Sequence, residues 1–288
     1  MAIVYLDGDY LREEDAKVSV LDRGFIFGDG VYEVIPCYGG HLFRLEQHLQ
    51  RLSDSLTGIR LSNPLSNSQW TEILEEVVKR NNDNSVDQSI YLQVTRGVAK
   101  RDHAFPDRVS PTIFIMSNPM HPVSNEKLEK GVVAITHEDI RWRYCHIKSI
   151  ALLPNTLMRQ VAREAGADEA ILDRDGKITE GAASNIFIVQ NGTIMTPPKD
   201  ECLLPGITRD LILEIAIDAG LNFCETDISR EQLQHADEIW LTSSTKEILP
   251  VTQLDGVPVG DGKPGPCWQD MLARYQHYKE RLRSGEAS

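Results

Sequence analysis

A chain of 288 residues, 41% hydrophobic and 25% charged, is long enough for about two domains and has the composition of a folded protein, which excludes wholesale disorder. The 43 acidic residues outnumber the 30 basic ones, and the net charge of −13 argues against general binding to nucleic acid or to anionic membranes. The longest stretch without a charged residue, Val109 to Asn125, contains three prolines, so it does not predict a membrane span.

The cysteines and histidines do not form the patterns of a metal site. The five cysteines are odd in number, widely spaced and never arranged as a Cys-x-x-Cys pair. The close histidine pairs have no acidic or cysteine partners at metal-ligand spacing. The N-terminal segment turns acidic after one short apolar run and has no signal-peptide pattern. We therefore expect reduced thiols, no metal and a cytoplasmic location.

The first part of the chain combines strand and helix patterns. Alternating apolar residues predict strands, and leucines recurring at steps of four and three predict a helix face. The predicted elements are a hairpin beginning with Ile3 to Leu6, a strand over Val31 to Tyr38, helices over Leu45 to Ile59 and Trp70 to Val78, and a strand over Ile90 to Thr95.

The segment from Ser117 to Ser124 is the best candidate for a linker. Pro119 and Pro122 restrict the residues before them to extended geometry, so we expect a stiff, extended connection. The predicted domains are a small N-terminal α+β domain of residues 1–120 and a larger C-terminal domain of residues 121–288.

The second domain is also predicted to mix strands and helices. Ser229 and Gln232 form a capping pair typical of a helix start. The other predicted elements are strands at 132–136, 170–172, 186–189 and 239–242, and helices at 155–165 and 208–219. The fold class predicted for the whole chain is therefore α+β with two domains.

Lys148 is a candidate nucleophile. It is the only formally charged side chain between Tyr144 and Met158. Apolar surroundings favour the neutral amine of a lysine, which is the nucleophilic form. On the pattern alone, a lysine that extends its amine along an apolar surface to water is the more common alternative.

Two further segments have the residues of a binding site. Leu204 to Asp210 leads into a helix, where Gly206 allows a close approach of the backbone and the free amides favour an anion such as phosphate. Most such segments are only helix caps. In Thr179 to Val189, Glu180 precedes small residues and an apolar strand, so its carboxylate is either buried against a cation or exposed in a loop.

Taken together, these features resemble the pyridoxal-phosphate-dependent class IV aminotransferases of fold type IV, and within them the D-amino-acid aminotransferases. The resemblance runs nearly from end to end. Its motifs are Asp22-Arg-Gly-Phe-Ile-Phe-Gly-Asp-Gly-Val-Tyr-Glu33, His48-Leu-Gln-Arg-Leu52, Tyr91-Leu-Gln-Val-Thr-Arg-Gly97, Asp139-Ile-Arg-Trp142, Ile147-Lys-Ser149, Thr179-Glu-Gly181, Gly206-Ile-Thr-Arg-Asp210 and Thr242-Ser-Ser-Thr-Lys-Glu247.

The resemblance implies pyridoxal 5′-phosphate as cofactor, lying between the two domains. Lys148 would form the Schiff base and move the substrate proton, and Glu180 would pair with the pyridine nitrogen. The residues implied to hold the rest of the cofactor are the amides of Ile207 and Thr208 with Arg51 and Ser244 at the phosphate, and Leu204 against one face of the ring.

The resemblance also implies a substrate site. Arg101 and His103, supplied by the neighbouring subunit of a homodimer, would bind the substrate α-carboxylate together with Tyr32. An exposed basic loop is the alternative. Ala182 and Ala183 stand where family members often have hydroxyl residues, and Asp102 adds a negative charge between the two carboxylate-binding residues.

The implied reaction is transamination between a D-amino acid, such as D-alanine or D-glutamate, and a 2-oxo acid such as 2-oxoglutarate or pyruvate. Two alternatives share the fold: a branched-chain L-amino-acid aminotransferase, disfavoured by the Arg-x-His loop, and an aminodeoxychorismate lyase. A cofactor-carrying binding protein without activity is disfavoured because Lys148 and Glu180 are both present.

Overall fold

The structure, a computed structural model, describes residues 2–81 and 86–286. It divides into two compact units. The first comprises Met1–His121, Ile147–Ala151 and Glu280–Ser288, and the second comprises Pro122–His146 and Leu152–Lys279. The first long segment ends one residue after the predicted boundary at residue 120. The segment around Lys148 differs from the prediction, because it belongs to the first unit and not to the C-terminal one.

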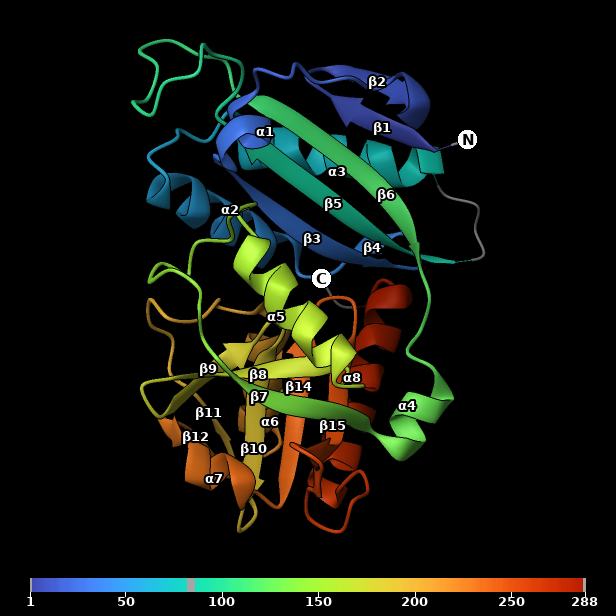
Figure 1. Cartoon of the computed structure of the whole chain (residues 1–288). Coiled ribbons are helices and arrows are strands. Elements are labelled where there is room, and N and C mark those ends of the chain that lie inside the picture. Colours follow the sequence, from blue (N-terminus) through green and yellow to red (C-terminus); the bar gives the residue numbers. More distant parts are fainter. Residues whose placement is uncertain (1, 82–85, 287–288) are drawn as a thin grey trace. The chain divides into compact units, whose positions relative to one another are not determined.

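The first unit is built on one sheet of six strands in the order β2-β1-β6-β5-β3-β4 (Figure 1). The pairs in this sheet are antiparallel. The strands are β1 (Ile3–Leu6), β2 (Asp9–Arg12), β3 (Gly30–Tyr38), β4 (His41–Leu42), β5 (Asp87–Thr95) and β6 (Thr112–Met120). A short 3-10 helix, η1 (Glu13–Asp15), follows β2.

Helices α2 (Leu45–Gly58) and α3 (Asn67–Asn81) pack on one face of this sheet (Figure 1). Their apolar faces meet the inward side chains of β3, β5 and β6, and Trp70, Leu52 and Ile90 are fully buried there. A short helix, α1 (Arg23–Phe27), is capped at its N-terminus by Asp22, whose carboxylate accepts a hydrogen bond from the Gly24 amide at 2.7 Å.

The segment around Lys148 joins this unit through backbone pairing and apolar packing. Ile147 lies in the core beside α2, where Gly58 leaves space for its side chain. The Tyr32 amide donates to the Lys148 carbonyl at 3.0 Å, and the Ile150 amide donates to the Gly30 carbonyl at 3.1 Å. These contacts are the physical reason why Lys148 belongs to the first unit.

The second unit contains one mixed sheet in the order β12-β11-β10-β14-β15-β7-β8-β9-β13, with β16 paired to β15. Its strands are β7 (Val132–Glu138), β8 (Glu169–Arg174), β9 (Lys177–Gly181), β10 (Asn185–Gln190), β11 (Thr193–Thr196), β12 (Phe223–Glu225), β13 (Ile228–Ser229), β14 (Glu238–Ser243), β15 (Glu247–Leu254) and β16 (Val257–Pro258).

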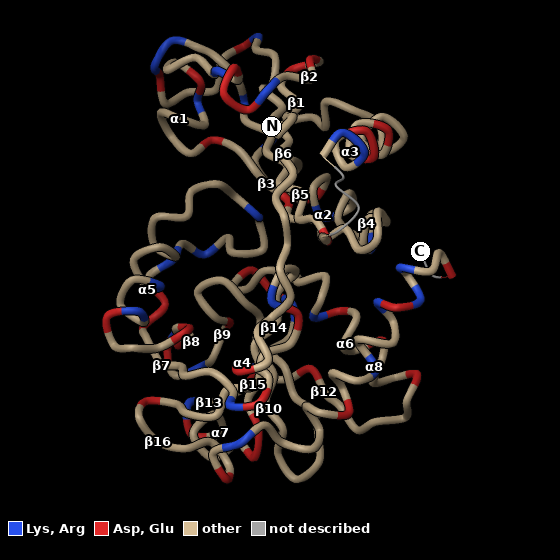
Figure 2. Tube along the Cα trace, turned by 90° about the vertical axis from the view of Figure 1, so that its right-hand side faces the viewer, with Lys and Arg blue, Asp and Glu red and all other residues tan. Residues whose placement is uncertain are grey.

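Helices cover both faces of this second sheet. Figures 1 and 2 place α5 on one face and α6 and α8 on the other. The helices of this part are α4 (Asn125–Lys130), α5 (Leu153–Glu164), α6 (Ile207–Asp218), α7 (Arg230–Gln234) and α8 (Pro266–Arg283), of which α8 belongs to the second unit as far as Lys279. Met158 and Ala162 of α5 pack against Ala170 and Leu172 of β8. Basic and acidic positions are scattered through both units and are not gathered on one element (Figure 2).

Most predicted elements are confirmed, and Ser229 and Gln232 form the predicted capping box of α7. The predicted linker is correct only in part. Residues up to Met120 belong to β6, where they pair with β5, because the extended geometry imposed by Pro119 is also that of a strand. None of the helices in the described ranges combines the length and the apolar composition needed to cross a membrane.

Candidate active site

The residues predicted to form the site fall into two groups, one in each unit. The first unit holds Lys148, Tyr32, Arg51, Arg101 and His103. The second unit holds Glu180, Leu204, Ile207, Thr208 and Ser244.

Lys148 is fixed by its backbone and lies against an aromatic ring. Its amide donates to the Ser55 hydroxyl at 3.1 Å, and its Nζ lies 4.1 Å from the centre of the Tyr32 ring. The Tyr32 ring in turn stacks on Tyr91 at 5.7 Å between centres. Within the described residues Lys148 Nζ forms no ion pair, so its amine is not committed to a carboxylate.

Arg51 belongs to a buried polar group with Glu33 and His48. Its Nε and Nη2 donate to the two Glu33 oxygens at 2.8 and 2.7 Å, and His48 Nδ1 lies 2.8 Å from Glu33 Oε2. Burial alone would raise the pKa of Glu33, but Arg51 and His48 lower it overall. Burial lowers the pKa of His48. The Arg51 guanidinium is therefore held in one orientation by an ionised carboxylate.

Arg101 and His103 lie in the exposed loop between β5 and β6 and share one aromatic ring. The Arg101 guanidinium carbon and the His103 ring each lie 5.5 Å from the centre of the Phe27 ring. No hydrogen bond, ion pair or ring contact joins either residue to Tyr32 in the described part of the chain. The structure thus places both loop residues against Phe27, and in the described residues neither contacts Tyr32 of the same chain.

Glu180 lies near the end of β9 and is buried, with 5% of its surface exposed. Its Oε1 forms an ion pair with Arg141. Its Oε2 accepts hydrogen bonds from the Leu204 amide at 3.1 Å and from Asn185 Nδ2 at 3.2 Å. Of the two alternatives for this residue, burial against a cation is the one observed.

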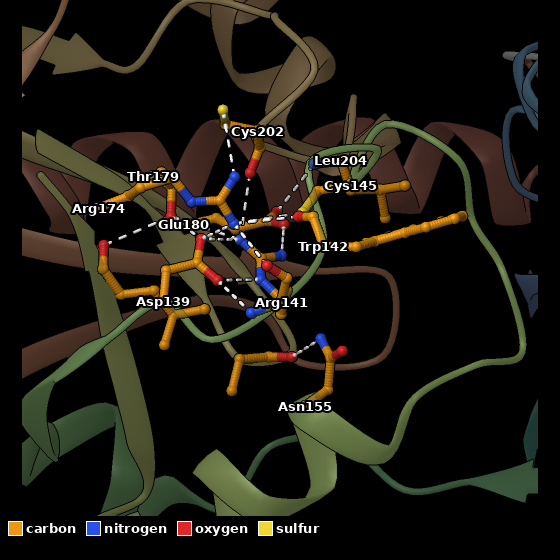
Figure 3. A network of polar contacts seen from close by, with 12 residues as sticks. Asp139, Arg141, Trp142, Cys145, Asn155, Arg174, Thr179, Glu180, Cys202 and Leu204 are labelled. Atoms are coloured by element: carbon orange, nitrogen blue, oxygen red, sulfur yellow. Dashed lines mark hydrogen bonds and ion pairs between the residues drawn. The ribbon is translucent and has the colours of Figure 1, made fainter.

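Arg141 is shared between two carboxylates (Figure 3). Its Nε and Nη2 donate to the two Asp139 oxygens, each at 2.8 Å, and only Nη1 reaches Glu180. Arg174 also contacts Asp139, at 2.9 Å. Burial raises the pKa of Glu180, and the negative charge of Asp139 acts in the same direction, whereas Arg141 and the Leu204 amide act against the shift. The Glu180 carboxyl group is thus fixed in position by Arg141, Leu204 and Asn185.

The beginning of α6 provides unsatisfied polar groups. The first amides of a helix have no partners within the helix. At α6 the preceding residue is Gly206, which has no side chain to accept from them. A Cβ at Gly206 would approach Asn185 Oδ1 to 1.9 Å. The Thr208 hydroxyl, and that of Thr242 on β14, are buried without a hydrogen-bond partner in the described residues. Buried hydroxyls of this kind are free to bond to a polar group that enters the site.

Leu204 and Ser244 occupy loops of the second unit. Leu204 uses its amide for Glu180, and its carbonyl accepts from Asn185 at 2.8 Å. Ser244 lies in the turn between β14 and β15. Their roles against the cofactor ring and phosphate remain predictions.

Sequence reasoning missed the residues that fix the predicted ones. It assigns no role to Arg141, Asp139 or Asn185 around Glu180, or to Glu33 and His48 around Arg51. The Asp139-Ile-Arg-Trp142 motif is a signal for part of this set, because an acid and a base two residues apart can form an ion pair. Among the described residues, no cluster of three His, Cys, Asp or Glu side chains could hold a metal ion.

Comparison with known proteins identifies the class of this fold and site. The model of the family amino-transferase class IV matches residues 30–254. The chain therefore belongs to the class IV aminotransferases, whose cofactor is pyridoxal 5′-phosphate.

Individual relatives carry more specific names. The chain is 39% identical to a D-alanine aminotransferase of Bacillus licheniformis over 274 residues, covering 95% of this chain and 96% of the relative. Among solved structures, the branched-chain amino acid aminotransferase of Escherichia coli has a TM-score of 0.91 and 32% identity, with 99% of this chain and 96% of that chain covered. That of the archaeon Thermoproteus uzoniensis, solved with norvaline, has a TM-score of 0.86 and 30% identity, with the same shares covered.

Proposed function

We propose that this chain is a D-amino-acid aminotransferase, which transfers the amino group of a D-amino acid such as D-alanine or D-glutamate to a 2-oxo acid. The observation that carries this proposal is the placement of Arg101 and His103 on one Phe27 ring, in a chain whose relatives are named D-alanine aminotransferases. A guanidinium and an imidazole in one loop can both donate to a carboxylate, which every amino acid presents.

The residues present fit the cofactor. Pyridoxal phosphate needs an amine to attach it, an acid for its ring nitrogen and donors for its phosphate. Lys148 supplies an uncommitted amine, and Glu180 supplies a buried carboxylate held by Arg141. The unpartnered Thr208 hydroxyl and the first amides of α6 supply donors. We assign Ser244 and Arg51 to the phosphate and Leu204 to the ring face as part of the same proposal.

The bound cofactor supplies an electron sink for the pair of electrons left when the substrate loses its Cα proton. Lys148 would remove the Cα proton as general base and deliver it to C4′ of the cofactor as general acid. Glu180 holds a proton at the pyridine nitrogen. Tyr32, Arg101 and His103 orient the substrate through its carboxylate.

The second candidate is a branched-chain L-amino-acid aminotransferase, favoured by the fold likeness to the Escherichia coli enzyme. A paired assay with D-alanine and L-leucine, each with 2-oxoglutarate, separates the two. We expect glutamate to form from D-alanine and only slowly from L-leucine. A faster reaction with L-leucine would replace our proposal with the second candidate. Pyruvate released from aminodeoxychorismate without an amino acceptor would instead indicate a lyase.

Arg101→Ala tests the carboxylate site. The change removes a charge-assisted contact worth roughly 1.5–3 kcal/mol, so kcat/KM for D-alanine should fall about 10- to 100-fold. A primary amine without a carboxylate should be unaffected, and so should cofactor binding. Lys100→Ala is the matched control, because Lys100 is an exposed basic residue of the same loop. Equal losses with both donors would contradict the assignment.

We also propose that the protein is a homodimer. An apolar surface in the first unit supports this: Val20, Leu21, Phe25, Val98 and Phe105 are 46–73% exposed. Two of the segments that carry these residues are adjacent, since the Ala99 amide donates to the Leu21 carbonyl at 3.3 Å. Exposed apolar surfaces of this kind mark interaction sites. Sedimentation of the parent and of Phe25→Asp measures the oligomeric state directly.

The proposed compartment is the cytoplasm. All five cysteines are free thiols, and two of them, Cys37 and Cys145, are buried. A chain that keeps five unpaired thiols is suited to a reducing environment. Fractionation of the cells that produce the protein tests this location.

A further inference from the structure

The loop between β5 and β6 has little structure of its own. Residues 100–105 are exposed and lie outside any helix or strand. Inside the loop, the Ala104 amide donates to the Asp102 side chain at 3.1 Å. Yet Arg101 and His103 can bind a carboxylate productively only if the loop holds them in a fixed position. The loop must therefore be anchored from outside.

Arg23, the first residue of α1, provides such an anchor. Its side chain is 4% exposed. Its Nη1 donates to the carbonyl of Asp102 at 2.7 Å and to that of Ala104 at 3.3 Å. These carbonyls are the ones immediately before and after His103. One buried guanidinium thus holds the backbone on both sides of a residue of the carboxylate site.

Asp29 connects this anchor to the rest of the first unit. Its Oδ2 accepts from Arg23 Nε at 2.7 Å and from Arg96 Nε at 2.8 Å. Arg96 Nη2 donates to the Ile59 carbonyl at 2.6 Å, just after the end of α2. Asp29 immediately precedes β3, the strand that contains Tyr32 and pairs with the Lys148 segment. The loop is thus tied to the beginning of β3 in its own chain.

The Phe27 ring fixes the side chains that the backbone anchor leaves free to rotate. Its centre lies 4.7 Å from the Arg23 guanidinium carbon, and the contacts at 5.5 Å with Arg101 and His103 lie on the same ring. Contacts between a guanidinium and an aromatic face are worth more where water is excluded. Arg23 therefore holds the backbone on both sides of His103, and Phe27 of the same helix contacts the side chains of Arg101 and His103.

We infer that Arg23, with Phe27, is a positioning residue for the substrate carboxylate: it sets the location of Arg101 and His103 without touching substrate. This inference rests on the proposed function of the loop. Lysine cannot replace Arg23, because an ammonium lacks the planar fork that reaches Asp29 and two carbonyls at once.

Kinetics with D-alanine on Arg23→Lys in the parent and in an Arg101→Ala/His103→Ala background test the inference. Arg23→Lys should lower kcat/KM of the parent about tenfold, mainly through KM, with unchanged cofactor content. In the Arg101→Ala/His103→Ala background the same change should cost less than about twofold, because both groups that it positions are already absent. Trypsin should also cleave after Lys100 and Arg101 several-fold faster in Arg23→Lys than in the parent.

The outcomes separate the inference from the proposed function. If Arg101→Ala loses activity but Arg23→Lys changes kcat/KM by less than twofold, Arg23 is not a positioning residue and the carboxylate site stands. Equal costs of Arg23→Lys in both backgrounds would show a general structural role and overturn the inference. If Arg101→Ala itself has no effect, the proposed carboxylate site fails. Should Arg23→Lys not fold, Phe27→Leu takes its place with the same expected coupling to Arg101 and His103.

Discussion

Replacing Lys148 with alanine should lower kcat by at least about 10³-fold, because the change removes both the amine that attaches the cofactor and the group that moves the substrate proton. The amine lies against the Tyr32 ring, and within the described residues it forms no ion pair. Its loss should therefore not leave an unpaired carboxylate, and the variant should fold with the stability of the parent.

Borohydride reduction followed by peptide mapping provides the direct measurement. We expect the cofactor to be recovered covalently on Lys148, one of eleven lysines in the chain. Lys177→Ala is a suitable control because Lys177 is exposed and pairs only with Asp227 in the described contacts. Recovery of the label on another lysine, or full turnover by Lys148→Ala, would refute the assignment.

Glu180→Gln should lower kcat by about 10²-fold while cofactor still binds, because the change removes the charge that keeps the ring nitrogen protonated. The fold should tolerate it. Arg141 keeps its two hydrogen bonds to Asp139, and a glutamine oxygen can still accept from the Leu204 amide. KM for D-alanine should change little, since Glu180 is not proposed to touch the substrate carboxylate.

Single-turnover measurements on Glu180→Gln show whether the loss in kcat arises at the chemical step, where we expect it. Glu225→Gln is the control, because it removes an acid that pairs with Arg209 in the same unit and has no proposed role in the reaction. A Glu180→Gln variant that reacts at the parental rate would make Glu180 a purely structural residue of the Arg141 network.

Elements with strong periodicity can be predicted from the sequence, and those without it cannot. The leucines of α2 and the alternation in β5 specify which face is buried, and both elements are present. Helix α8 is an exception, because it is absent from the predicted elements although its buried residues Trp268, Met271, Tyr275 and Leu282 recur at steps of three, four and seven. Strand β15 also escapes prediction, because it is buried along most of its length and lacks alternation.

The sequence offers candidates for the chemistry-bearing residues of the site, but not for the residues that support them. Lys148 and Glu180 stand out locally, as a charge among apolar residues and an acid before a strand. The pairing of Glu33 with Arg51, or of Arg141 with Glu180, depends on contacts between residues 18 and 39 positions apart. No local pattern encodes such contacts, because they arise only when the strands and helices pack. The same holds for Arg23, which reaches a loop 79 residues away.

The placement of residues 147–151 in the first unit constrains how the protein can be made. During synthesis, the β1–β6 sheet emerges before Ile147, which fills part of its core, and before Lys148 and Ile150, which pair with β3. The nascent first unit therefore cannot reach its final packing until residue 151 has been translated and has left the ribosome. A fragment ending at residue 121 should expose the apolar surface that Ile147 covers and aggregate. Simple truncation would therefore not yield the isolated unit, whereas joining residues 147–151 to residue 121 through a flexible linker should improve its solubility.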